Sequence, residues 1–357
     1  MIRWGIARTR TKTPSPRTIA EIQAALTDLP EYGRERDRRI RAMQDVATAW
    51  ITAGDWASVF ALRAWAWRHP LFDTPRALLR GFLRRWEEAL LSGAPLADAA
   101  TLVRDDVTTA VFDPWERLAA RATWAELRPL LADDRAAWCV AEARVLRGET
   151  LGGRSPHSGM PLRRFRWEPE LEPPSFSVMG ASWGSGGFRS TLAPATLPSA
   201  IERLAHEPEW EHLFSVWSEW DTQVVKVAGT GIQALATLLG AHGAAGRWHP
   251  QGAVTVGRCP WKEALAAMMR MHGYPAPYTD GHGLAEARRA VWRVLAAAAG
   301  VRWPVGGSRL QAAMKGWRWS RYDPHEPYAE ADLWSLFLTL EDPRRGLAWA
   351  TYAWVTD

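Results

Sequence analysis

Apolar residues recur at spacings of three and four throughout residues 18–148, which is the period of helices with one buried face. One such stripe runs from Ile40 to Ile51 and ends at Gly54, and Asp55 follows as a candidate N-cap for the next helix. Asp113 before Pro114 is the preferred residue order for another helix start. No residue pattern repeats at a fixed period. The sequence therefore predicts an irregular array of antiparallel helices joined by short turns.

The pattern changes at residues 149–162, a stretch rich in Gly, Ser and Pro that we interpret as a linker. Residues 163–357 then mix strand and helix patterns in no strict alternation, which is typical of an α+β domain. The predicted fold class is thus mainly α, with an α+β C-terminal part. Strands are expected at 165–167, 175–183, 224–227, 253–256, 316–322 and after residue 346. Helices are expected at 197–206, 209–217, 232–239, 261–271, 284–299 and 333–340.

The chain has 357 residues, 47% of them apolar, which is enough for two domains with substantial cores. Its 23 tryptophans exceed the usual share, and we expect most of them to be core anchors because each indole buries a large apolar area. Only four of the 44 basic residues are Lys. This skew is typical of GC-rich codon usage, so the Arg content is weak evidence for phosphate binding.

The net charge of +5 resides in residues 1–17, which contain five basic residues and no acidic one. These residues are Arg3, Arg8, Arg10, Lys12 and Arg17. The composition predicts a disordered, solvated arm. Nucleic acid is an expected partner only through this arm.

Cys139 and Cys259 are the two cysteines of the chain, and no C-x-x-C spacing accompanies them. We expect both to be reduced and structural. The N-terminus has no signal-peptide pattern, and no window approaches 18 uninterrupted apolar residues. We therefore expect a cytoplasmic protein without a membrane partner.

A glycine pattern at Gly229-Thr230-Gly231 follows a predicted strand and opens a predicted helix, as in dinucleotide-binding loops. Such a site also needs a carboxylate after the next strand, to bind a ribose hydroxyl. The strand at 253–256 is followed by Gly257-Arg258-Cys259, which supplies none. We therefore predict no nucleotide and no other cofactor.

Residues able to carry chemistry gather in a Tyr/Pro/Gly loop near the C-terminus, which contains Tyr274, Tyr278, Asp280 and His282. Together with His272, the loop has ligand types that zinc or iron accepts. The two histidines lie ten positions apart, which matches no short metal-binding signature. We therefore predict no metal and keep the loop as a candidate ligand or partner site.

A second group of candidates includes Trp317 and Trp319 in a predicted strand, followed by Asp323, His325 and Glu326. Two interpretations remain open. Acidic residues near the start of the next helix favourably meet its dipole, which requires no function. Alternatively, the three polar residues form an acid/base cluster beside the tyrosine loop.

Six segments in chain order carry a resemblance to a known family, namely 28–55, 218–225, 273–283, 290–300, 331–334 and 347–357. Together they resemble a bacterial family known only as domain of unknown function 6183. This chain departs from the family pattern at His272, where a second glycine usually precedes the loop tyrosine. The family has no assigned activity, so the resemblance implies no catalytic residue.

Two functional hypotheses follow from the sequence. The first is a cytoplasmic binding protein that engages a protein or peptide partner through exposed Trp, Tyr and Arg side chains, since no complete catalytic constellation is found. The alternative is a hydrolase or small-ligand enzyme that uses Tyr274, Asp280 and His282 together with His325 and Glu326. The alternative requires these side chains to converge in one pocket.

Overall fold

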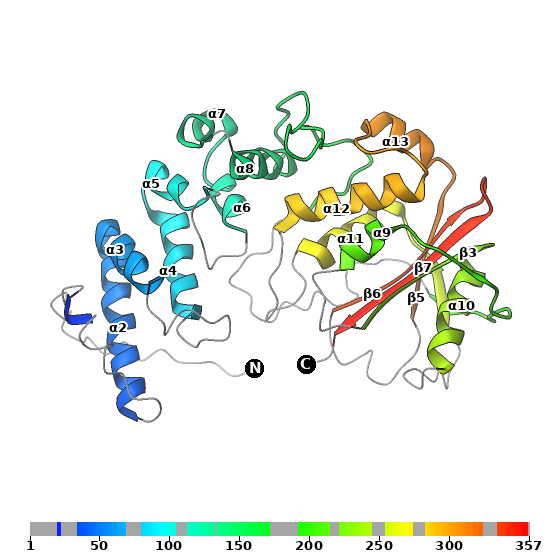
Figure 1. Cartoon of the computed structure of the whole chain (residues 1–357), viewed down its shortest axis with the longest axis horizontal. Coiled ribbons are helices and arrows are strands. Elements are labelled where there is room, and N and C mark those ends of the chain that lie inside the picture. Colours follow the sequence, from blue (N-terminus) through cyan, green and yellow to red (C-terminus); the bar gives the residue numbers. More distant parts are fainter. Residues whose placement is uncertain are drawn as a thin grey trace. The chain divides into compact units, whose positions relative to one another are not determined.

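The computed structural model of the chain describes residues 20–22, 34–68, 80–104, 113–132, 134–171, 192–214, 221–244, 254–273, 283–323 and 334–355. It divides into two compact units, Met1–Asp134 and Arg135–Asp357. The basic arm predicted at residues 1–17 lies outside the described residues. Helices and strands of each unit are labelled in Figure 1.

The first unit is helical, as the sequence predicts. Helix α4 packs against α2, α3 and α6, and its Leu83, Trp86 and Leu90 are buried. Pro114 occupies the first turn of α6, where a missing N–H costs nothing. The helices are α2 (Arg34–Ala53), α3 (Trp56–Ala66), α4 (Arg80–Gly93), α5 (Leu96–Thr101), α6 (Pro114–Ala119), α7 (Trp124–Leu127) and the 3-10 turn η2 (Arg128–Leu130).

Asp55 caps α3, because its carboxylate accepts the backbone N–H of Ser58 at 3.3 Å and the Ser58 hydroxyl at 2.6 Å. We expect Asp55→Ala to lower the free energy of unfolding of this unit by about 1 kcal/mol, measured by urea denaturation. Asp98→Ala is the control, since this exposed carboxylate lies in the first turn of α5, a helix whose N-cap residue makes no side-chain capping bond. Equal losses in both variants would contradict the capping role.

Within the described residues, seven strands of the second unit form one antiparallel sheet in the order β1-β4-β5-β6-β7-β3-β2. The longest pairing joins β6 to β7, with Trp334 opposite Val355 at one end and Asp342 opposite Leu347 at the other. The short strands β1 and β2 lie at opposite edges of the sheet. The strands are β1 (Ala193–Pro194), β2 (Arg203–Leu204), β3 (Asp221–Ala228), β4 (Thr255–Arg258), β5 (Arg318–Asp323), β6 (Trp334–Asp342) and β7 (Leu347–Val355).

Helices cover both faces of this sheet (Figure 1). One face packs on α11 (Trp261–Gly273), which lies against α12 (Gly283–Ala298), and α12 contacts α9 (Pro208–Phe214). The other face packs on α10 (Gly231–Ala244). The apolar side chains of each strand divide between two hydrophobic cores, so the second unit is a three-layer α+β structure.

The second unit begins earlier than the sequence predicts, because α8 (Arg135–Leu146) packs in it and not in the helical array. Glu142 of α8 is buried, accepts the Ser158 hydroxyl at 2.5 Å and pairs with Arg289 of α12 at 3.3 Å. Ser158 belongs to the predicted linker, whose buried residues and backbone bonds show that it is part of this core. A buried ion pair thus joins α8 to α12.

Three local predictions are wrong. Residues 165–167 form a turn that Glu168 closes by accepting the Phe165 N–H at 2.7 Å. Residues 197–206 are not helical: Leu197 and Ile201 pack beside α10 from an extended segment. Residues 334–342 form strand β6. The apolar spacing there mimics a helix because both faces of this central strand are buried.

Among the described residues, no helix combines the length and the apolar character needed to cross a membrane.

Candidate functional site

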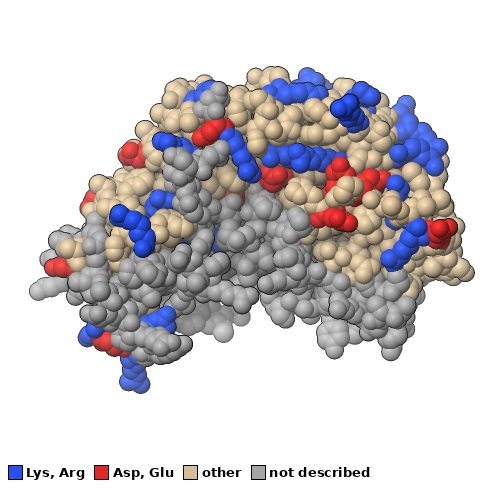
Figure 2. All heavy atoms as spheres, viewed as in Figure 1, with Lys and Arg blue, Asp and Glu red and all other residues tan. Residues whose placement is uncertain are grey.

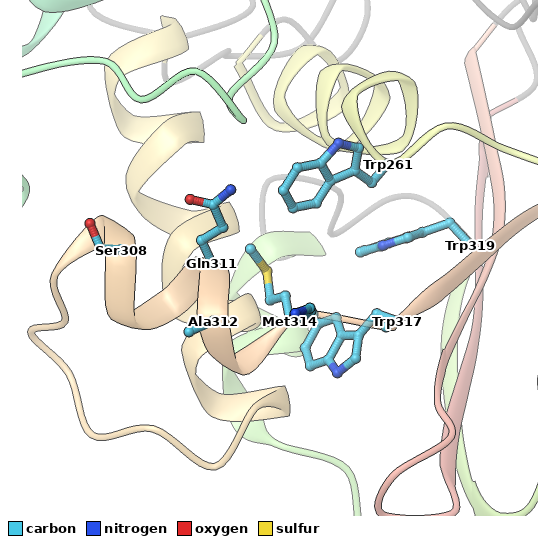
Figure 3. A pocket seen from close by; sticks show the side chains of 9 residues that line it. Trp261, Ser308, Gln311, Ala312, Met314, Trp317 and Trp319 are labelled. Atoms are coloured by element: carbon cyan, nitrogen blue, oxygen red, sulfur yellow. The ribbon is translucent and has the colours of Figure 1, made fainter.

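Two residues that the sequence singles out, Trp317 and Trp319, line a cavity of about 490 Å³ in the second unit (Figure 3). This volume is within the usual range for ligand pockets. Trp319 belongs to β5 and Trp317 precedes it by two residues, so the strand period sends both side chains to the same face. With Trp261 they bound what we call the indole cavity.

Helix α13 (Gly307–Ala313) and the first residue of α11 complete the wall of the indole cavity. Three residues of α13 line the cavity, namely Ser308, Gln311 and Ala312. They occupy positions i, i+3 and i+4 of the helix and therefore lie on one side of it. Trp261 opens α11 and extends toward the cavity from the opposite side, while buried Met314 projects between α13 and the rings (Figure 3). Elements separated by about fifty residues of sequence thus form one site.

Ring packing behind the cavity holds the three indoles in place. The centroid of the Trp261 ring lies 5.9 Å from that of Trp167, which in turn lies 5.0 Å from that of Trp292. Trp317 lies 6.4 Å from Trp319 and 6.4 Å from Trp349, both of which are buried. Such offset and tilted pairs are the favoured aromatic geometries. The cavity is therefore preformed and does not require a rearrangement of its rings.

Polar groups of the cavity come from Ser308, Gln311 and Lys315, all of them exposed. The residues that line the cavity include no Asp, Glu, His or Cys. The lining thus offers apolar surface and hydrogen-bond donors, but no carboxylate or imidazole to act as a general base. This composition is suited to binding.

Asp323 ends β5, whereas Trp317 lies just before its start. Asp323 lies four positions along the extended strand from Trp319, a distance of about 13 Å. Asp323 pairs across the sheet with Thr255 and faces Arg321, whose pKa is lowered by burial and partly restored by this carboxylate. The structure therefore does not bring Asp323 to the indole cavity.

The remaining sequence candidates lie outside the described residues. They are Tyr274, Tyr278, Asp280, His282, His325 and Glu326. The hydrolase hypothesis depends on these residues and stays a prediction.

The sequence also links His272 to this loop. In the structure, its side chain makes a hydrogen bond within the protein core. Its imidazole is 1% exposed, and Nδ1 lies 2.8 Å from the carbonyl oxygen of Leu213. A carbonyl only accepts, so Nδ1 carries the proton and the bond joins α11 to α9. Within the described part of the chain, no group of three or more His, Cys, Asp or Glu side chains is placed to hold a metal ion.

Both cysteines are buried and unbonded to each other, as the sequence predicts. Burial, with the nearby Glu142 carboxylate, raises the pKa of Cys139 to about 11. Burial, with Glu263, raises the pKa of Cys259 to about 12. Neither thiol is therefore a thiolate at neutral pH, which is the form that acts as a nucleophile.

The Gly229–Gly231 loop joins strand β3 to helix α10, in the order of a dinucleotide loop. However, the backbone N–H of Gly231 donates to Glu341 Oε2 at 2.9 Å. Glu341 also pairs with Arg318 at 3.1 Å. The protein's own carboxylate thus occupies the place where a phosphate would meet the helix N-terminus.

Sequence reasoning missed Trp261, α13 and Met314 as parts of a site. The residues of α13 that line the cavity are small or polar and give no pattern of their own. The available signal was the alternation of Trp317 and Trp319, which places two large rings side by side on one face of a strand. It did not show which element lies opposite.

Comparisons with models of protein families, with curated proteins and with solved structures find no match to this chain, and the resemblance described above stays a prediction.

Proposed function

We propose that this protein is a binding protein, and that it engages a protein or peptide partner through the indole cavity. The observation that carries the proposal is the convergence of Trp261, Trp317 and Trp319 on one open cavity that lacks acidic, His and Cys side chains. Tryptophan is the residue type most enriched among interface hot spots. Trp261 and Trp317 remain half-buried although the chain buries many other indoles.

The rigidity of the site also favours binding. The lining side chains of a preformed cavity are already ordered, so binding does not cost their conformational entropy. The packing of Trp317 on Trp349, and of Trp261 on Trp167, supplies this rigidity.

A cytoplasmic location is part of the proposal. Its support is that Cys139 and Cys259 are both free, as expected in a reducing compartment.

The experiment is selection from a displayed peptide library on the full chain, followed by affinity measurements on the enriched peptides. Ala312 is exposed and lines the cavity, so Ala312→Trp should fill the cavity without removing any core side chain. We expect this variant to weaken binding by at least about tenfold, which corresponds to the loss of one substantial interface contact.

The matched control is Ala125→Trp, which replaces an exposed alanine of α7 in the first unit. It should bind the enriched peptides as the unchanged protein does. Failure of the library to enrich any peptide, or equal binding by the Ala312→Trp variant, would contradict the proposed function. Circular dichroism and thermal unfolding establish that both variants are folded.

A further inference from the structure

We propose that the indole cavity accepts the C-terminal residue of a peptide, with an apolar or aromatic side chain among the rings and its free carboxylate on Lys315. This inference rests on the proposed function, because it names the chemistry of the partner at the same cavity.

Lys315 is the charged residue that lines the cavity, and its side chain is exposed. Among the described residues its ammonium group has no ion-pair partner. Lys and Arg side chains also gather over α13 on the face shown in Figure 2. A cationic ligand would be repelled here, which disfavours the methylammonium groups that aromatic cages otherwise bind. The charge therefore selects an anionic group.

The hydrogen-bonding capacity of the lining points the same way. An ammonium and an indole N–H only donate. Gln311 and Ser308 can also donate, and Figure 3 shows the Gln311 side chain extending from α13 toward the cavity. No carboxylate lines the cavity, so an anionic acceptor for these donors has to come from the ligand. A carboxylate offers two oxygens and a full charge.

The apolar part of the cavity takes up a side chain. Three indole rings and the buried Met314 provide flat and polarisable surface, which favours aromatic and large aliphatic groups. The polar groups and the rings border one volume of about 490 Å³. A ligand must therefore present an apolar group and an anionic group close together.

A peptide C-terminus meets this requirement within one residue, because the side chain and the carboxylate branch from the same Cα atom. An internal acidic residue does not, since its carboxylate and the neighbouring apolar side chain leave an extended backbone on opposite faces. An internal residue keeps its carbonyl oxygen, but a backbone N–H replaces the second carboxylate oxygen and the negative charge is lost. The covalent geometry thus favours a terminus over an internal segment.

The test compares two short fluorescein-labelled peptides that both end in phenylalanine, one with a free carboxylate and one with a C-terminal amide. Fluorescence anisotropy with the full chain gives both affinities. We expect the free acid to bind at least about tenfold more tightly than the amide, as for the loss of one charge-assisted hydrogen bond. The difference should shrink as salt is added, because the ammonium is exposed.

Lys315→Gln should remove the difference between acid and amide, whereas Lys262→Gln should keep it. Lys262 is another exposed lysine, next to Trp261, that does not line the cavity, so it controls for a general loss of positive charge. Both positions are at the surface, and neither substitution removes a buried contact.

The outcomes separate the two proposals. Equal binding of acid and amide, no change with Lys315→Gln, or binding of neither peptide overturns the preference for a C-terminus. If library-selected peptides still lose affinity with Ala312→Trp, the proposed function holds and only the ligand class is wrong. If no peptide of any kind binds the cavity, the proposed function fails as well.

Discussion

Replacing Arg288 with methionine is expected to lower the free energy of unfolding of the second unit by about 3–5 kcal/mol. Arg288 is fully buried, and its guanidinium meets the Glu168 carboxylate at 2.6 Å and 3.0 Å. It also donates to the carbonyl oxygens of Pro161 and Arg163. Removal of the cation leaves a buried, uncompensated carboxylate, whose desolvation accounts for most of the loss. Guanidinium denaturation followed by circular dichroism gives the value.

A double variant separates the charge from the packing. Arg288→Met combined with Glu168→Gln removes both charges and keeps one amide oxygen, which can accept from Trp292 or from the backbone of Phe165 but not from both, because these donors bond to different carboxylate oxygens of Glu168. We expect this pair to be more stable than Arg288→Met alone. Arg38→Met is the surface control, because its pair with Glu35 is exposed and screened by solvent and should contribute only a small amount of stability. A loss of that small size at Arg288 would contradict the buried ion pair.

The helices that the sequence predicts best are those with their own local signals. Helix α3 begins after the Asp55 cap and α6 begins at Pro114, as predicted. A cap, a proline and an apolar stripe act within a few residues, so they can be read without knowledge of the fold. Strand β6 carries no such signal. Its apolar residues serve two cores, and only the presence of β5 and β7 beside it determines a strand.

The candidate site was predictable only in part, for a similar reason. The alternation of Trp317 and Trp319 gave one wall of the indole cavity, because strand period is a local property. The opposite wall comes from Trp261 and from α13, whose position depends on long-range packing.

Gly307→Ala is expected to displace α13 and to lower the free energy of unfolding of the second unit by about 1–3 kcal/mol. Gly307 is buried at the first position of α13, and a Cβ atom there would lie within 3.0 Å of three Phe165 ring carbons. The Phe165 ring cannot easily yield, because it packs against Trp167 and Trp292. Since Ser308 and Gln311 follow directly on α13, peptide affinity at the indole cavity should fall too.

Gly240→Ala is the matched control for this change. Gly240 lies within α10, where an added Cβ would meet only Ala200 at 3.5 Å, an ordinary contact. Helix propensity then predicts stabilisation of up to about 1 kcal/mol, the opposite sign from Gly307→Ala. A second variant tests the cause: Phe165→Leu should make Gly307→Ala less costly, because a smaller side chain leaves room for the methyl group. If Gly307→Ala stabilises the protein as Gly240→Ala does, close packing of α13 on Phe165 does not fix the wall of the cavity.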